Sequence, residues 1–271
     1  MEDKNLSRFI GFYETPPLWI GQLNGIQQFV FPEIDFKDFK PQPLPTNLRL
    51  GHQLEQVFFQ LINSAATYRI LAHNTPVRKN KISLGEIDFI VEDLTANLLI
   101  HIELTYKFYL VDPNIPEEQQ QLIGPNRRDS FFRKKEKIIN HQIPLIYSPE
   151  GILALSDLGI AQEALQHHVC FKAQLFVPFT NKSTTLPSFN PKCIIGYWFS
   201  FQIFESEGFQ EFEYYIPAKK EWPIPPHKDV IWSSHFDILP TVRNYMKNEQ
   251  SLMIWIKKPL RPIEKHFIVW W

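Results

Sequence analysis

Residues 82–110 read ISLGEIDFIVEDLTANLLIHIELTYKFYL, and they decide how the rest of the chain is interpreted. Apolar and polar residues alternate over 82–91 and again over 98–110, which is typical of β-strands with one apolar face. Residues 93–97 between them read as a turn, so the two strands are predicted to form a hairpin whose second face is available for chemistry. That face carries Glu86, Asp88, His101, Glu103, Thr105, Lys107 and Tyr109.

Asp88 and Glu103 are the strongest candidates for a functional site. In a hairpin that turns at 93–97 they come opposite or diagonal to each other. Two carboxylates with a few carbonyls and waters are what Mg²⁺ requires. Lys107, on the same face, can orient or activate an attacking water and offset charge on a phosphoryl group. The competing interpretation is that these residues are surface charges without a function; Glu86 is the reserve ligand.

The flanking sequence predicts an α/β protein. We expect a helix over 46–64, capped by Thr46 or Asn47, and a short strand over 68–71. After the hairpin we expect a loop over 111–126, helices over 129–141 and 156–168, and a strand over 169–177. A helix is also expected over 239–248. Aromatic strands are predicted over 193–204, 212–216, 252–256 and 267–271.

This αβββαβ order resembles the PD-(D/E)XK nuclease superfamily, which has the restriction-endonuclease-like fold. The resemblance lies in LGHQLEQVFF, GEIDFIV and IHIELTYKF and covers roughly residues 46–178. More narrowly, ELTYKFYL and GPNRRD look like an uncharacterised bacterial family, the domain of unknown function numbered eighteen-fifty-three. The resemblance implies that Asp88 and Glu103 are the two metal-binding acids, that Glu55 is an auxiliary acid, and that the Leu104 carbonyl is a further ligand.

One position departs from the nuclease pattern. The pattern has a lysine two residues after the second acid, where this chain has Thr105. Lys107 lies two residues further on the same face, roughly 6–7 Å along the strand. Its long, flexible side chain spans that gap, which makes Lys107 the substitute. The departure also supports an alternative, in which the fold has no catalytic activity and binds nucleic acid or protein.

The densest basic run of the chain follows the loop. Arg127, Arg128, Arg133, Lys134, Lys135 and Lys137 lie within 11 residues of one another. A solvated helix face is one explanation. The other is a phosphate-contacting edge beside the metal site, for which Arg127, Arg128, Lys134 and Lys135 are our candidates.

Composition limits the remaining possibilities. The chain has 271 residues, 28 Lys and Arg against 29 Asp and Glu, and a net charge of −1, which excludes a polybasic coat protein and an acidic tail. With 10 Gly against 22 Pro and no GxGxxG or GxxxxGK[ST] string, dinucleotide and P-loop chemistry are not expected. Cys170 and Cys193 are too few for a disulfide framework, and no signal peptide or membrane span is recognised. These features favour a cytoplasmic location for the protein.

Three regions are therefore expected: an N-terminal wrapping segment over 1–45, a nuclease-like core over 46–178, and a β-rich C-terminal extension over 179–271 packed on the core. The predicted function is a Mg²⁺- or Mn²⁺-dependent nuclease that hydrolyses phosphodiester bonds, with DNA favoured as the substrate and no membrane partner.

Overall fold

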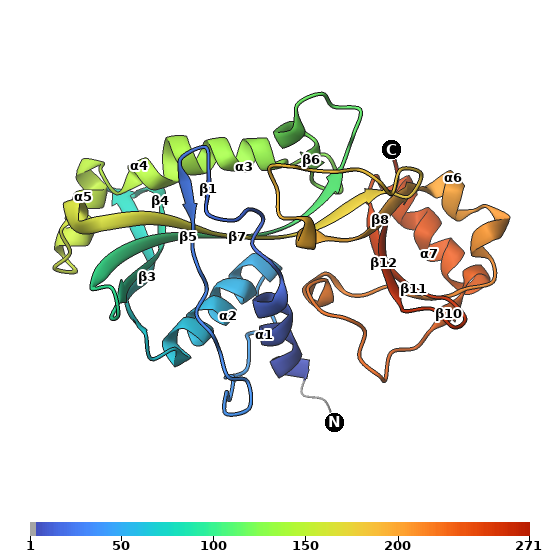
Figure 1. Ribbon diagram of the computed structural model, residues 1–271, viewed down its shortest axis with the longest axis horizontal. Helices are drawn as coiled ribbons and strands as arrows, with labels where there is room; N and C mark the ends of the chain where they lie inside the picture. The colour runs from blue at the N-terminus through green and yellow to red at the C-terminus, as the bar shows by residue number, and fades with distance from the viewer. Residues whose placement is uncertain (1–3) are drawn as a thin grey trace. The chain divides into compact units, whose positions relative to one another are not determined.

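The computed structural model describes residues 4–271 and shows a mixed α/β fold built on one mixed β-sheet (Figure 1). The described residues contribute 12 strands to this sheet. The helices are α1 Lys4–Glu14, α2 Leu50–Ser64, α3 Phe131–Lys137, α4 Ile143–Leu145, α5 Pro149–Ser156, α6 Phe201–Phe204 and α7 His235–Lys247. The strands are β1 Gln22–Leu23, β2 Ile26–Gln28, β3 Tyr68–Lys79, β4 Ile82–Asp93, β5 Leu98–Val111, β6 Leu122–Ile123, β7 Leu165–Pro178, β8 Ile194–Ser200, β9 Glu213–Tyr215, β10 Ser233–Ser234, β11 Leu252–Lys257 and β12 Glu264–Val269.

The chain divides into two compact units, and it enters each of them more than once. The first, which we call the hairpin unit, comprises 17–106 and 133–172. The second, which we call the aromatic unit, comprises 1–16, 107–132 and 173–271. Strands β5 and β7 pass from one unit into the other at 106/107 and 172/173. The linear division at 45/46 and 178/179 remains a prediction.

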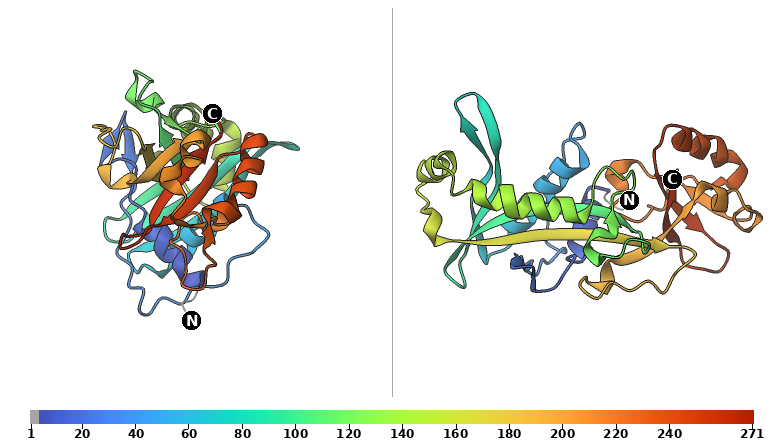
Figure 2. Two further views of the ribbon diagram at one scale, coloured as in Figure 1. Left: turned by 90° about the vertical axis from the view of Figure 1, so that its right-hand side faces the viewer. Right: turned by 90° about the horizontal axis from the view of Figure 1, so that it is seen from above.

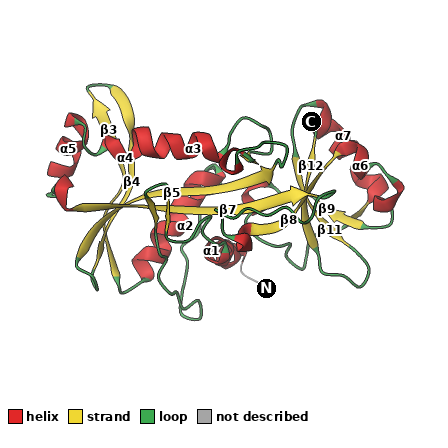
Figure 3. Ribbon diagram, turned by 45° about the horizontal axis from the view of Figure 1, so that its top comes forward, coloured by secondary structure: helices red, strands yellow, loops and turns green. Residues whose placement is uncertain are grey.

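In the hairpin unit, β3, β4 and the first part of β5 form an antiparallel series. Figure 3 shows β3 and β4 as a long pair of strands, with α5 beside them. Their core contains Val77, Ile87, Ile90 and Ile146, all buried. Helix α2 packs on β4 through Phe58 and Phe89, whose ring centroids are 4.6 Å apart. This packing fixes α2 against the strand that carries Asp88.

In the aromatic unit, the strand order is β10-β9-β11-β12-β8, followed by the second part of β7. Strand β8 is parallel to both β12 and β7, whereas β9, β11 and β12 pair antiparallel. The core of this unit is rich in aromatic side chains, among them Phe199, Phe204, Phe209 and Tyr214. The aromatic excess of the C-terminal sequence is therefore mainly core packing.

The αβββαβ order is confirmed along the chain as α2, β3, β4, β5, α3 and β7, with β6 and further short helices inserted. Several boundaries were wrong. Helix α2 begins at Leu50, where Arg49 is the N-cap residue and makes no side-chain cap bond, so neither Thr46 nor Asn47 caps it. Strand β3 extends to Lys79 instead of ending at 71, because residues up to 79 pair with β4.

The helix predicted over 156–168 does not exist. Helix α5 ends at Ser156, Gly159 has a φ of +70°, and residues 165–168 already belong to β7, where His168 pairs with Gln27. His167 and His168 are therefore strand residues and not helix-terminal ones. In the C-terminal part, the strand predicted over 193–204 ends at Ser200, whose hydroxyl caps the short helix α6.

Candidate functional site

Asp88 and Glu103 face each other across β4 and β5. The ladder between these strands runs to the pair Phe89 and Ile102, and the next step along both strands brings Asp88 opposite Glu103. Asp88 Oδ2 accepts a hydrogen bond from the backbone N–H of Leu104 at 2.9 Å, so its carboxylate lies against β5. The hairpin thus brings the two carboxyl groups close together, as expected from an opposite or diagonal placement, and each acts on the pKa of the other.

The polar face of the hairpin is largely buried on β5, whereas the alternation predicted an accessible face. His101 and Glu103 have no exposed surface, and Thr105 is also buried. The cover comes from residues distant in sequence, because Gln142 contacts Glu103 and His167 contacts His101. Glu86, in contrast, is exposed, which removes it from this buried cluster.

Burial controls the charge of the two carboxyl groups. It raises the pKa of Asp88 to about 7, and the nearby charge of Glu103 adds to this rise, while the Leu104 N–H and Lys134 oppose it. Burial likewise raises the pKa of Glu103 to about 7, against the lowering influence of Lys134, Lys137 and the hydrogen bonds from Gln142 and Asp88. Two carboxyl groups in such contact share a proton near neutral pH.

Gln142 and Lys134 connect the carboxylates to the helical segment after the loop. The Gln142 amide donates to Glu103 Oε2, and its carbonyl accepts from Lys134 Nζ at 2.8 Å. Residues 138–142 form a π-helical turn between α3 and α4. Lys134 and Gln142 are eight residues apart, and in a regular α-helix this separation rotates the second side chain by about 80° around the helix axis relative to the first. The wider π turn reduces this offset and brings Gln142 onto the face of Lys134.

A second chain of polar contacts leads away from Glu103. His101 Nδ1 lies 3.0 Å from His167 Nδ1, and His167 Nε2 lies 2.6 Å from the hydroxyl of the exposed Tyr147. Burial lowers the pKa of His101 and of His167 to about 4, so both rings are neutral at pH 7. Spacing in the sequence pointed to neither Tyr147 nor Gln142, because both come from segments that meet the hairpin only in the folded chain.

One carboxylate oxygen of this cluster has no hydrogen-bond partner. Glu103 Oε1 lies 3.2 Å from His101 Nε2, but the two atoms are not aligned for a hydrogen bond, and each is buried without a partner. A buried carboxylate oxygen without a donor is costly unless a cation or a proton satisfies it. Carboxylate oxygens are also the ligands that Mg²⁺ prefers, so Asp88 and Glu103 suit this ion chemically.

The other predicted ligand and lysine lie in different surroundings. Glu55 raises the pKa of Asp88 slightly, but its own carboxylate pairs with His52 Nδ1 at 3.0 Å. Within residues 4–271, no group of three or more His, Cys, Asp or Glu side chains is placed to hold a metal ion. In the aromatic unit, Lys107 Nζ donates to Asp129 Oδ2 at 2.5 Å, so its charge is paired with that carboxylate.

The predicted phosphate-binding residues separate into different environments. Arg127, in the aromatic unit, is 3.3 Å from Asp112 Oδ2, and its guanidinium lies 4.2 Å from the ring centroid of Trp271. Arg128 is exposed. Lys135 is buried and so is not part of an exposed basic surface. In the hairpin unit, Lys134 lies beside the carboxylates of Asp88 and Glu103.

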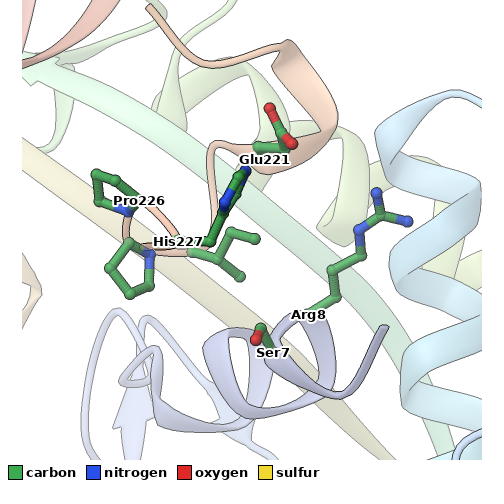
Figure 4. Close-up of a pocket in the computed structure, with 7 residues that line it drawn as sticks. Ser7, Arg8, Glu221, Pro226 and His227 are labelled. Atoms are coloured by element: carbon green, nitrogen blue, oxygen red, sulfur yellow. The ribbon is translucent and has the colours of Figure 1, made fainter. Parts of the chain in front are cut away.

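A small cavity of about 80 Å³ lies in the aromatic unit. Figure 4 shows that the Arg8 guanidinium extends away from the His227 ring, so the two side chains do not converge on a common point. The Glu221 carboxylate also lines the cavity. We therefore do not regard it as an anion site. No helix among the described residues is long and apolar enough to cross a membrane.

Comparison with known proteins gives one family. The sequence matches the family described as "Domain of unknown function (DUF1853)" over residues 36–260. No curated protein and no solved structure matches the chain.

Proposed function

The chain belongs to the DUF1853 family, and from its adjacent carboxylates, the half-buried Asp88 and the buried Glu103, we propose that it is a metal-dependent phosphodiesterase that cleaves nucleic acid, with DNA favoured. The observation that carries this proposal is the opposition of Asp88 and Glu103, with one buried Glu103 oxygen left without a partner. Perturbed pKa values of paired carboxyl groups are typical of functional sites.

Asp88 and Glu103 would hold the cation, together with waters and a substrate oxygen. Mg²⁺ commonly binds through one or two carboxylates and keeps several waters, so a third protein carboxylate is not required. When bound, a divalent cation makes a nucleophile from water and polarises the phosphoryl group. Gln142 holds the Glu103 carboxylate in place through its amide, and Asp88 is held by the Leu104 N–H.

Lys134 is the lysine that this proposal assigns to the site. It lies close enough to both carboxylates to lower their pKa values, and it contacts Gln142 directly. Its positive charge can offset the charge that develops on a phosphoryl group. The role predicted for Lys107 has less support, because the ammonium of that residue is paired with Asp129. The likeness to PD-(D/E)XK nucleases supports the proposal through the order of elements alone.

The test combines metal binding with cleavage. We expect the purified protein to bind Mn²⁺ or Mg²⁺ in calorimetry and to cleave plasmid, single-stranded or branched DNA. Asp88→Asn and Glu103→Gln should lose both properties. Glu86→Gln is the matched control, because Glu86 is an exposed carboxylate two residues from Asp88 on the same strand and should keep both. Cleavage that survives in both Asp88→Asn and Glu103→Gln would overturn the proposal.

A binding module without catalysis is the second candidate. Two contacts favour it, because they engage groups that catalysis would use. Gln142 donates to Glu103 Oε2, and the Lys107 ammonium is paired with Asp129. This candidate predicts DNA binding that is independent of divalent metal, no metal binding in calorimetry, and no cleavage of any of the three DNA forms.

A further inference from the structure

The tip of the β3–β4 hairpin extends beyond the core of the hairpin unit. Val77 is the last buried residue of β3, and Ile87 is the first buried residue of β4. All seven residues of 78–84 are exposed. We call this segment the ribbon tip; it turns at Asn80, whose φ is +55°, and Figure 2 shows the hairpin projecting as a two-stranded ribbon. The side chains of the ribbon tip therefore lie outside the core of the hairpin unit.

The ribbon tip is positively charged in a chain that is nearly neutral overall. It carries Arg78, Lys79 and Lys81 and no acidic residue, against a net charge of −1 for all 271 residues. Lys79 Nζ lies 3.4 Å from Oε1 of the half-buried Glu150, so the charge of Lys79 is partly offset by a residue outside the ribbon tip. A cluster of cations on a projecting element indicates a polyanionic partner.

Two aliphatic side chains follow these cations along the chain, on β4. Ile82 is 68% exposed and Leu84 is 43% exposed. Minor-groove proteins combine basic residues with Ile or Leu side chains that wedge between base steps, and a two-stranded ribbon fits a groove of duplex DNA. Residues 78–84 contain no aromatic side chain on which the bases of a single strand would stack. The composition of the tip therefore favours duplex over single-stranded DNA.

The same strand leads from the tip to the carboxylates. Asp88 lies six residues after Ile82 on β4, which corresponds to about 20 Å at roughly 3.3 Å per residue. In B-DNA, about 20 Å along the axis is roughly six base pairs. We propose that the ribbon tip binds in a groove of duplex DNA, about six base pairs from the phosphodiester bond at Asp88 and Glu103. This inference rests on the proposed nuclease function.

The first experiment measures DNA binding with cleavage silenced. Fluorescence anisotropy compares Asp88→Asn protein with the same protein carrying Arg78→Ala, Lys79→Ala and Lys81→Ala, using one labelled 30-base-pair duplex. We expect the tip variant to bind at least about tenfold more weakly at 0.1 M salt, with a salt slope lower by about 2–3. Lys37→Ala, Lys40→Ala and Lys247→Ala, which remove the same charge from exposed positions elsewhere, should change affinity less than twofold.

The second experiment measures the reach of the ribbon. Wild-type protein is given duplexes in which the flank on one side of the cleaved bond is shortened in steps. Cleavage should fall sharply once the flank is shorter than about six base pairs, and the tip variant should show no such step. Circular dichroism melting verifies that the tip variant is folded, as its exposed positions lead us to expect.

The possible failures are distinguishable. If the tip variant binds duplex like the control while Asp88→Asn still abolishes cleavage, the ribbon inference is wrong and the proposed function stands. If the tip variant loses binding to anionic phospholipid vesicles but not to DNA, the tip is a lipid-binding element and the inference is again wrong. If wild-type protein neither binds nor cleaves any DNA, the proposed function fails first.

Discussion

The Asp88 carboxylate accepts the backbone N–H of Leu104 at 2.9 Å, across the strand pair that forms the candidate site. This contact ties a charged side chain to the neighbouring strand at the point where the regular ladder from Phe89 and Ile102 ends. Asp88 is thus held in place at a position where burial disfavours its charge. Because the fold holds the Asp88 carboxyl where its ionised form is disfavoured, the stability of the protein should depend on the protonation of this group.

We predict that Asp88→Asn stabilises the protein above neutral pH. The pKa of Asp88 is about 7 in the fold, above its ordinary value, so between pH 4 and 7 the folded state keeps a proton that the unfolded state releases. Stability therefore falls as pH rises through this range. Asparagine keeps an oxygen that can accept from the Leu104 N–H, and it removes the charge. The substitution should therefore raise the free energy of unfolding by about 2 kcal/mol at pH 8 and leave it unchanged near pH 4.

Urea unfolding at pH 4 and pH 8 measures this difference. Asp88→Ala serves as the comparison, because it removes the charge but leaves the Leu104 N–H without its acceptor, at a cost of about 1–3 kcal/mol. If the Asn variant is less stable than the wild type at pH 8, the ionised carboxylate of Asp88 does not destabilise the folded state and the prediction is wrong.

The buried histidines should make the protein sensitive to acid. The pKa of His101 is about 4 in the fold, below its ordinary 6.5, so the unfolded state binds a proton that the folded state does not between these values. Stability should fall as pH drops from 6.5 to 4, and His101→Asn should reduce this fall. Tyr147→Phe, which removes only the hydroxyl on His167, should cost about 1 kcal/mol and leave the pH dependence unchanged. Chemical denaturation in steps of half a pH unit distinguishes the two variants.

Lys265 should give a pH dependence of stability with the same sign as that of His101, at higher pH, and opposite in sign to that of Asp88. It is buried in the aromatic unit, where Nζ donates to Gln174 Oε1 at 2.6 Å and to the carbonyl of Trp222, and burial lowers its pKa to about 7. Above pH 7 the folded state has lost a proton that the unfolded state still binds, so stability should rise by up to about 1.4 kcal/mol per pH unit. Lys265→Met should flatten this rise between pH 7 and 9, and an unchanged slope in calorimetric melts would contradict the assignment.

Gly196 should tolerate no side chain. A Cβ built there would lie 1.9 Å from the Lys265 carbonyl oxygen, on the partner strand of the parallel β8–β12 pair. Gly196→Ala should therefore cost at least about 3 kcal/mol, because the clash is with backbone and cannot be relieved by a rotamer change. Gly51→Ala is the control: no atom lies within 4 Å of its Cβ, and in α2 the added methyl should stabilise by about 0.5–1 kcal/mol. Denaturant midpoints of the two variants test the contrast.

The part of the site that depends on local pattern was predictable. Strand alternation has a period of two, so two strands joined by a short turn place Asp88 opposite Glu103 whatever the rest of the chain does. The same locality explains the errors. An apolar repeat over 156–168 is compatible with a helix, but Gly159 ends the helical segment, and pairing of His168 with Gln27 makes the last residues a strand. That partner is more than a hundred residues away.

The sequence by itself determined the α/β class, the order of the core elements and the opposition of the two carboxylates, because these follow from short-range periodicity and turn chemistry. Only the tertiary structure decided that the polar face is buried, that Gln142 and Lys134 reach Glu103, and that Lys107 is paired with Asp129. Burial and electrostatic environment depend on which distant segments pack together. The charge state of Asp88 and Glu103, and with it the chemistry available to this protein, is therefore a property of the fold.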